Sequence, residues 1–189
     1  MTLMAQDGAA RVIAQQWISL DGYAAGHDED AIFSAVPAEA DLRSQRYNEA
    51  LLNDVDQVML GRRTYEMFRE YWPTASEPIT AGINGIPKVV ASRTQAAAPW
   101  GAFAPATVCR DAVEFVRQCG GGTLLVWGSI DLVHTLLTAG LLDELDLFVS
   151  PIWLGAGRPL LPAGSTVGLR QSASEDWGGV THLRYTVER

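Results

Sequence analysis

Short apolar runs alternate with longer segments of helical period along most of this chain, and this alternation constrains the fold more than any other feature. Its clearest instance is TLLVWG at residues 123–128, followed directly by SIDLVHTLLTAGL at 129–141. A short run with this many apolar residues is typical of a strand that is covered on both faces. The second segment repeats its apolar residues at helical spacing, with Ser129 placed to cap its start. The pair predicts a central strand and a helix that packs on the sheet.

The same alternation extends in both directions from this pair. Further strands are predicted at residues 11–20, 56–61, 87–94 and 142–154, and further helices at 37–55, 62–72 and 111–122. Residues 73–87 are rich in proline, glycine and small polar residues, which predicts a long functional loop, and residues 168–188 predict a hairpin. We therefore predict an α/β fold with a mainly parallel central sheet, an antiparallel hairpin at its carboxyl end, and helices on both faces.

Composition and charge narrow the class of protein. With 189 residues and 48% hydrophobic content, the chain suffices for one domain, which we place at residues 11–189 behind a flexible amino-terminal segment 1–10. The formal net charge of −8 argues against nucleic acid or an anionic membrane as a partner. Two cysteines, without a C-x-x-C pair or a histidine cluster, predict neither a disulfide framework nor a metal site. This cysteine usage predicts a reducing, cytoplasmic location, and we expect neither an export signal nor a membrane span.

Three of the predicted strands end alike, in a small residue followed by arginine or hydroxyl side chains. The carboxyl ends of parallel strands lie along one edge of a sheet, so these residues are expected to share one ligand. Helix amino termini and arginine side chains both favour phosphate groups. Each end taken alone also fits a plain turn with a solvated arginine, but the three together favour a phosphorylated cofactor. The residues concerned are Gly61, Arg62, Arg63 and Thr64, then Ser92 and Arg93, then Gly128, Ser129 and Ile130.

Six stretches spread over nearly the whole chain carry a family resemblance. They are SLDGYAAG, DQVMLGRRTYE, YWP, KVVASRT, GGTLLVWGSIDLVHTLLTAGLLDEL and PIWLGAGRPLL, in that order. As a set they resemble the dihydrofolate reductase-like superfamily, and within it the reductase domain of the riboflavin-biosynthesis deaminase-reductase and its stand-alone bacterial relatives. The resemblance implies that fold, NADPH bound across the strand ends, a small-molecule substrate and a homodimer.

The resemblance also assigns roles at the three strand ends. Residues 61–64 would contact the pyrophosphate and the 2′-phosphate side of NADPH, and Ser92 and Arg93 would hold the adenosine 2′-phosphate. Residues 128–130 look like the glycine turn that admits the pyrophosphate and the nicotinamide ribose. The chain lacks the H-x-E and P-C-x-x-C zinc set that the deaminase half of the riboflavin enzyme requires. The resemblance therefore covers a reductase-type domain alone.

At the substrate end, the resemblance implies a catalytic Asp21, which would bind the substrate or deliver a proton beside the nicotinamide. The alternative is a plain Asp-Gly turn. Trp17 is a candidate to stack on the substrate ring, with core packing as its alternative. Folate-reducing members carry a carboxylate on the first helix, at a place that falls here near Ser44 and Gln45. Gln45 is thus a substrate-binding candidate, and folate reduction is disfavoured unless a gap brings Asp41 or Glu49 there.

Three readings of function follow from these residues. The first is an NADPH-dependent reductase that transfers a hydride to a C=N or C=O bond of a small pteridine- or pyrimidine-like acceptor. The second is true dihydrofolate reduction, and the third is a non-catalytic nucleotide-binding module. His134 and His182 are interpreted as structural side chains. Residues 151–161, interrupted by glycines, are interpreted as a bulged edge strand or a subunit contact.

Overall fold

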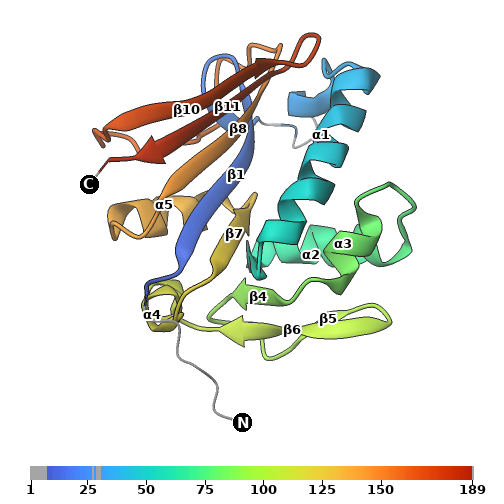
Figure 1. Ribbon diagram of the computed structural model, residues 1–189, viewed down its shortest axis with the longest axis vertical. Helices are drawn as coiled ribbons and strands as arrows, with labels where there is room; N and C mark the ends of the chain where they lie inside the picture. The colour runs from blue at the N-terminus through green and yellow to red at the C-terminus, as the bar shows by residue number, and fades with distance from the viewer. Residues whose placement is uncertain (1–7, 27, 29–30, 189) are drawn as a thin grey trace.

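The computed structural model describes residues 8–26, 28 and 31–188, so the segment predicted to be flexible, 1–10, lies mostly outside the described residues. Helices cover both faces of a central sheet (Figure 1). The strands are β1 (Arg11–Ser19), β2 (Tyr23–Ala25), β3 (Gln57–Gly61), β4 (Lys88–Ala91), β5 (Ala98–Trp100), β6 (Phe103–Cys109), β7 (Thr123–Trp127), β8 (Glu144–Ser150), β9 (Arg158–Pro159), β10 (Leu169–Asp176) and β11 (Thr181–Val187). The helices are α1 (Ala38–Leu51), α2 (Arg62–Tyr71), α3 (Thr80–Gly85), α4 (Ala112–Gln118) and α5 (Ile130–Thr138), with short 3₁₀ turns η1 (Ala31–Phe33), η2 (Leu52–Asp54) and η3 (Trp72–Thr74).

Within the described residues, nine strands form the main sheet in the order β10-β11-β8-β1-β7-β3-β4-β6-β5. The strands from β8 to β6 in this order run parallel, whereas β11 pairs antiparallel with β8, β10 with β11, and β5 with β6. The predicted mainly parallel sheet with an antiparallel carboxyl-terminal hairpin is confirmed. The strand β7 lies at the centre of the order, as its unbroken apolar run predicted.

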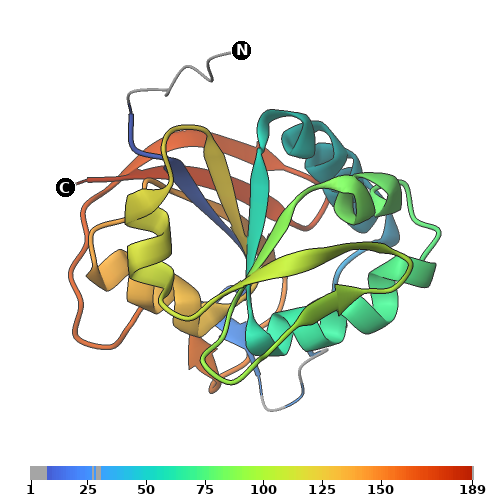
Figure 2. The ribbon, with the colours of Figure 1, turned by 90° about the horizontal axis from the view of Figure 1, so that it is seen from below.

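Alternation along each strand sends side chains to two separate hydrophobic layers. On one face, Val12 and Ala14 of β1 pack with Leu132, Val133 and other residues of α4 and α5. On the other face, Ile13 packs among residues of α2 and α3, and the α1 side forms a smaller cluster around Phe148. Figure 2 shows α4 and α5 on one side of the strands and α1, α2 and α3 on the other.

Three parts of the chain differ from the sequence prediction. Residues 73–87 are not a plain loop, because they include the end of η3 and all of α3, and Ile79 and Ile83 are buried there. The strands β5 and β6 were not predicted. Residues 151–161 do not form an edge strand of the main sheet, since β9 pairs antiparallel with β2 in a separate two-stranded sheet.

No helix in the described part of the chain has both the length and the apolar character needed to cross a membrane.

Candidate functional site

The turns after β3 and β7 meet at the carboxyl edge of the sheet, as their sequences predicted. The Gly61 amide donates to the Ser129 hydroxyl at 2.7 Å, and the Ser129 amide donates to the Thr64 hydroxyl at 3.1 Å. The Ser129 hydroxyl in turn donates to the carbonyl of Trp127 at 2.9 Å. The predicted cofactor residues of the two strand ends therefore form one hydrogen-bonded unit.

The Gly128–Ser129 turn has an unusual backbone. Both residues have positive φ, 56° at Gly128 and 63° at Ser129, and Ser129 is the one non-glycine residue with positive φ in the described part of the chain. Ser129 is in the cap position of α5 but its side chain does not cap the helix, because its hydroxyl is committed to Gly61 and Trp127. The prediction of a side-chain cap was wrong.

Peptide N–H groups of the next residues remain available to a ligand. Arg62 and Arg63 are the first residues of α2, and Ile130 and Asp131 are the first residues of α5. The amides in the first turn of a helix have no acceptor within the helix. The dipoles of these two helices place partial positive charge at the same edge. The backbone of the two turns thus presents donors that suit the oxygens of a phosphate or pyrophosphate.

Arginines follow three neighbouring strands at this edge. In the sheet register, Gly61 of β3 lies beside Ala91 of β4, and Ala91 lies beside Cys109 of β6. The residues that follow, Arg63, Arg93 and Arg110, are all exposed. The Arg110 guanidinium donates to the Arg93 carbonyl at 2.5 Å. Arg110 was not predicted as a site residue, although it follows β6 directly, as Arg62 and Arg63 follow β3.

The three predicted arginines differ in how far they are already paired. Arg62 forms an i,i+4 ion pair with Glu66 at 3.0 Å on the exposed side of α2. Among the described residues, the guanidinium groups of Arg63 and Arg93 have no ion-pair partner. Arg63 and Arg93 are therefore better placed than Arg62 to bind an anionic ligand, because they need not break an existing pair.

Ser92 supports the turn after β4. Its hydroxyl accepts from the amide of Gln95 at 3.1 Å, and its own amide donates to the Cys109 carbonyl at 2.9 Å. Ser92 is buried, and Arg93 beside it is exposed. A direct contact of Ser92 with a cofactor stays a prediction.

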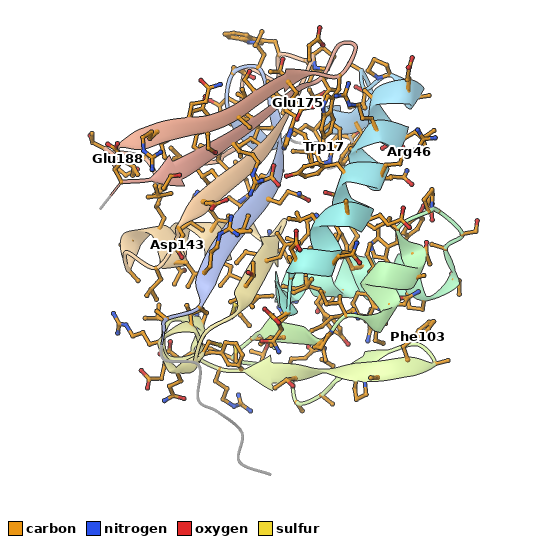
Figure 3. All side chains as sticks on the ribbon, viewed as in Figure 1. Trp17, Arg46, Phe103, Asp143, Glu175 and Glu188 are labelled. Atoms are coloured by element: carbon orange, nitrogen blue, oxygen red, sulfur yellow. The ribbon has the colours of Figure 1, made fainter. Side chains whose placement is uncertain are left out.

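Trp17 lies between the sheet and α1, in the part of the molecule where a substrate is predicted (Figure 3). Its ring meets Phe33 edge-on at 5.5 Å between centroids and Phe148 at 5.0 Å. Trp17 is half-buried and Phe33 is 47% exposed, so this aromatic group reaches the surface. The stacking role of Trp17 stays a prediction, and its packing against Phe148 is evident.

The inward face of α1 carries no carboxylate. Its buried residues are Ala40, Ser44 and Asn48, whereas Asp41 and Glu49 are exposed, one position beyond the inward residues. Gln45 is half-buried and donates to the Asp41 carboxylate at 2.9 Å, while its own side-chain oxygen is buried and has no hydrogen-bond partner among the described residues. That oxygen is free to accept from a ligand, so Gln45 stays a substrate-binding candidate.

Asp21 does not stand free in a cleft. Its two carboxylate oxygens accept from the backbone amides of Leu154 and Gly155, at 3.1 and 2.7 Å. Desolvation raises the pKa of Asp21, but hydrogen bonds from the Ser19 hydroxyl and these two amides outweigh it and lower the pKa below its usual value. An acid that stays ionised and fully hydrogen-bonded is a poor proton donor.

A buried polar network under α1 was also missed. Asp146, fully buried on β8, accepts from the Tyr47 hydroxyl at 2.9 Å, from Gln15 at 3.0 Å, and pairs with His182 at 2.6 Å. His182, interpreted from the sequence as a structural side chain, is thus held in place by Asp146. Burial and the charge of Asp146 raise the pKa of Tyr47. The shared partner Asp146 lies 131, 99 and 36 residues along the chain from Gln15, Tyr47 and His182, so no local signal marked the network.

The described residues include no group of three or more His, Cys, Asp or Glu side chains that is placed to hold a metal ion. A surface hollow of about 370 Å³ lies at the opposite edge of the sheet, lined by Ala10, Arg11 and Glu144 among others. It is remote from the carboxyl edge and contains none of the predicted site residues.

The chain is similar in sequence and in fold to several known proteins. The uncharacterized protein YyaP of Bacillus subtilis (strain 168) is 24% identical over 155 residues, which cover 79% of each chain. A structure of a putative riboflavin biosynthesis protein from Shewanella sp. PV-4 matches with a TM-score of 0.74 at 24% identity, covering 95% of this chain and 99% of that one.

A Thermotoga maritima diaminohydroxyphosphoribosylaminopyrimidine deaminase/5-amino-6-(5-phosphoribosylamino)uracil reductase matches with a TM-score of 0.64 at 14% identity, over 95% of this chain. The match covers 57% of that longer protein. The model of the RibD C-terminal domain matches residues 10–183. The chain therefore belongs to the RibD C-terminal domain family.

Proposed function

We propose that this protein is an NADPH-dependent reductase that transfers a hydride to a small, planar heterocycle of the pteridine or pyrimidine class. The observation that carries the proposal is the joined pair of turns, in which Ser129 bonds both Gly61 and Thr64. The amino termini of α2 and α5 begin at these turns, and Arg63 and Arg93, which have no ion-pair partner among the described residues, follow β3 and β4 at the same edge. This is the chemistry that a dinucleotide with an additional phosphate requires.

On the cofactor side, residues 61–64 and 128–130 would hold the pyrophosphate and the nicotinamide ribose through backbone N–H groups. Arg93, with Arg63 from the adjacent strand end, would hold the 2′-phosphate, while Ser92 would keep the turn in shape. NADPH supplies the hydride when bound. The protein would orient the ring and exclude water from it.

On the substrate side, the acceptor ring would lie near Trp17 and Phe33, with Gln45 offering a hydrogen-bond acceptor. Since the inward face of α1 lacks a carboxylate, a folate-type pterin would find no anionic partner there, and folate reduction remains disfavoured. The proton that completes the reduction would come from water rather than from Asp21, because both oxygens of Asp21 already accept hydrogen bonds. A homodimer, by family resemblance, and a location in the reducing cytoplasm, from the cysteine content, are part of the proposal.

The proposal is tested by fluorescence titration of the purified protein with NADPH and, in parallel, with NADH. We expect Arg63→Ala and Arg93→Ala each to weaken NADPH binding by about tenfold, the effect of removing one charge-assisted contact, and to change NADH binding little. Arg170→Ala is the matched control, because Arg170 is an exposed arginine on β10, at the far end of the sheet. Absence of binding to either nucleotide would contradict the proposal.

A substrate screen then separates an enzyme from a non-catalytic binding module. Loss of NADPH absorbance in the presence of reducible pterins, pyrimidines or related heterocycles would identify a reductase. A protein that binds NADPH tightly but oxidises it with none of these acceptors would support the binding module instead.

A further inference from the structure

Residues 151–161, which we call the strap, run from the end of β8 across the end of β1. Asp21 holds the strap at its first bend, where both carboxylate oxygens accept from the amides of Leu154 and Gly155. Gly155 has a φ of 71°, so the chain turns sharply there. The Asp21 carboxylate thus satisfies two consecutive amides of a turn that has no place in the main sheet.

The strap is held along its length by the chain on either side of Asp21. The Leu20 amide donates to the Ile152 carbonyl at 2.9 Å, and the Leu160 amide donates to the Gly22 carbonyl at 3.0 Å. Between them, Gly157 lies so close to β2 that a Cβ atom there would be 2.1 Å from the Ala25 carbonyl oxygen. The strap therefore fits closely on residues 20–25.

The far end of the strap contacts α5. Arg158 forms an ion pair with Asp131 in the first turn of that helix. His134, one turn later, donates from Nε2 to the carbonyls of Pro159 and Leu160, at 3.1 and 3.0 Å. Both acceptors are carbonyl oxygens, so this nitrogen carries the proton. The strap thus links Asp21 to the helix that begins directly after Ser129.

We propose that Asp21 is a positioning residue: by holding the strap against the end of β1, it fixes the first turn of α5 and with it the Gly128–Ser129 turn of the cofactor site. This inference rests on the proposed function for its cofactor, and it replaces proton donation as the role of Asp21. Asp21 would touch neither substrate nor nicotinamide. Its effect on cofactor binding would pass through Arg158, His134 and the start of α5.

Hydrogen–deuterium exchange of the full chain tests the proposal independently of any substrate. In Asp21→Ala we expect exchange at the amides of Leu154 and Gly155 to rise by at least about tenfold, because they lose a charged acceptor. Exchange at Leu132 and Val133, whose amides bond the Ser129 carbonyl, should rise as well, and NADPH affinity should fall several-fold. Asp21→Asn keeps one acceptor oxygen and should give intermediate values for all three.

The matched control is Asp176→Ala. The Asp176 carboxylate also accepts from two turn amides, those of Gly178 and Gly179, at 2.9 and 3.4 Å. Its loss should speed exchange in that hairpin turn and leave residues 132, 133, 154 and 155 unchanged. Arg158→Ala breaks the other end of the strap and should reproduce the changes at Leu132 and Val133.

An Asp21→Ala protein that keeps slow exchange at Leu154 and Gly155, or at Leu132 and Val133, overturns the proposal. Unchanged NADPH affinity in that variant overturns it as well. If the wild-type protein binds no NADPH, the proposed function fails by itself, and the two pairs of amides then decide whether Asp21 positions the start of α5.

Discussion

At the scale of single residues, Gly128 is constrained both by its left-handed backbone conformation and by the close approach of Thr64. Its φ is 56°, and a Cβ atom would be 3.1 Å from the methyl carbon of Thr64. The hydroxyl of Thr64 accepts a hydrogen bond from the Ser129 amide. We expect Gly128→Ala to cost about 1–2 kcal/mol of stability from the left-handed backbone alone. It should also weaken NADPH binding by about tenfold or more, because Thr64 must move.

Gly140 provides the matched control for this prediction. Its φ is 67°, but nothing lies within 4 Å of a Cβ atom there. Gly140→Ala should therefore lower the free energy of unfolding in thermal or urea denaturation, because of its left-handed backbone, and leave the NADPH affinity unchanged. Equal NADPH affinity in the two variants would mean that the Gly128–Thr64 contact does not shape the cofactor site.

At the scale of elements, Lys88 joins α3, β4 and β5. Its ammonium group donates to the carbonyls of Asn84 and Ile86, where α3 ends, and lies 4.6 Å from the centroid of Trp100. Lys88 forms no ion pair with a carboxylate in the described part of the chain, and burial lowers its pKa to about 8. The folded protein therefore releases this proton at a lower pH than the unfolded chain, whose lysines have a pKa of about 10.4.

The sign of the pH effect follows from that difference. Between about pH 8 and pH 10 the unfolded chain binds more protons at this position, so the contribution of Lys88 to stability rises with pH. We expect the melting temperature of the wild type, relative to Lys88→Met, to increase from about pH 7 to about pH 9.5. Arg170→Met, at an exposed position, should show no such trend. Parallel pH profiles for wild type and Lys88→Met would refute the prediction.

The elements that were predicted and those that were not are formed by different interactions. The strand β7 and the helix α5 have apolar residues at a regular period, so their local sequence is sufficient. By contrast, α3 contains two glycines, and β5 and β6 each contain a proline. They form because Ile79, Ile83 and Trp100 pack into the core on that face, and this tertiary packing leaves no periodic signal.

The same distinction applies to the candidate site. The two turns and their arginines could be predicted because each lies directly after a strand, where the fold class alone fixes its place. The hydrogen-bond partners of Asp21 could not be predicted, because Leu154 and Gly155 lie more than 130 residues further along the chain. The prediction of a functional role for Asp21 came from its place after the first strand, whereas its environment depends on the path of the strap.

At the scale of the whole molecule, we compare two candidate places for the predicted homodimer contact. One is β10, whose outer edge is unpaired in the sheet, but its exposed Arg170, Glu175 and Asp176 discourage edge pairing. The other is the apolar pair Trp153 and Leu20, 71% and 69% exposed, on segments joined by the bond from the Leu20 amide to Ile152. Large exposed apolar groups in one place mark contact surfaces.

We therefore expect light scattering to find a dimer for the wild type and a monomer for Trp153→Ser combined with Leu20→Ser. Phe103→Ser removes another exposed aromatic side chain, 45% exposed on β6 near the other end of the sheet, and should leave the dimer intact. A monomeric wild type would end the dimer prediction. A dimer that survives the double substitution but is lost on introducing proline into β10 would place the contact at the sheet edge, because proline removes a donor from that edge.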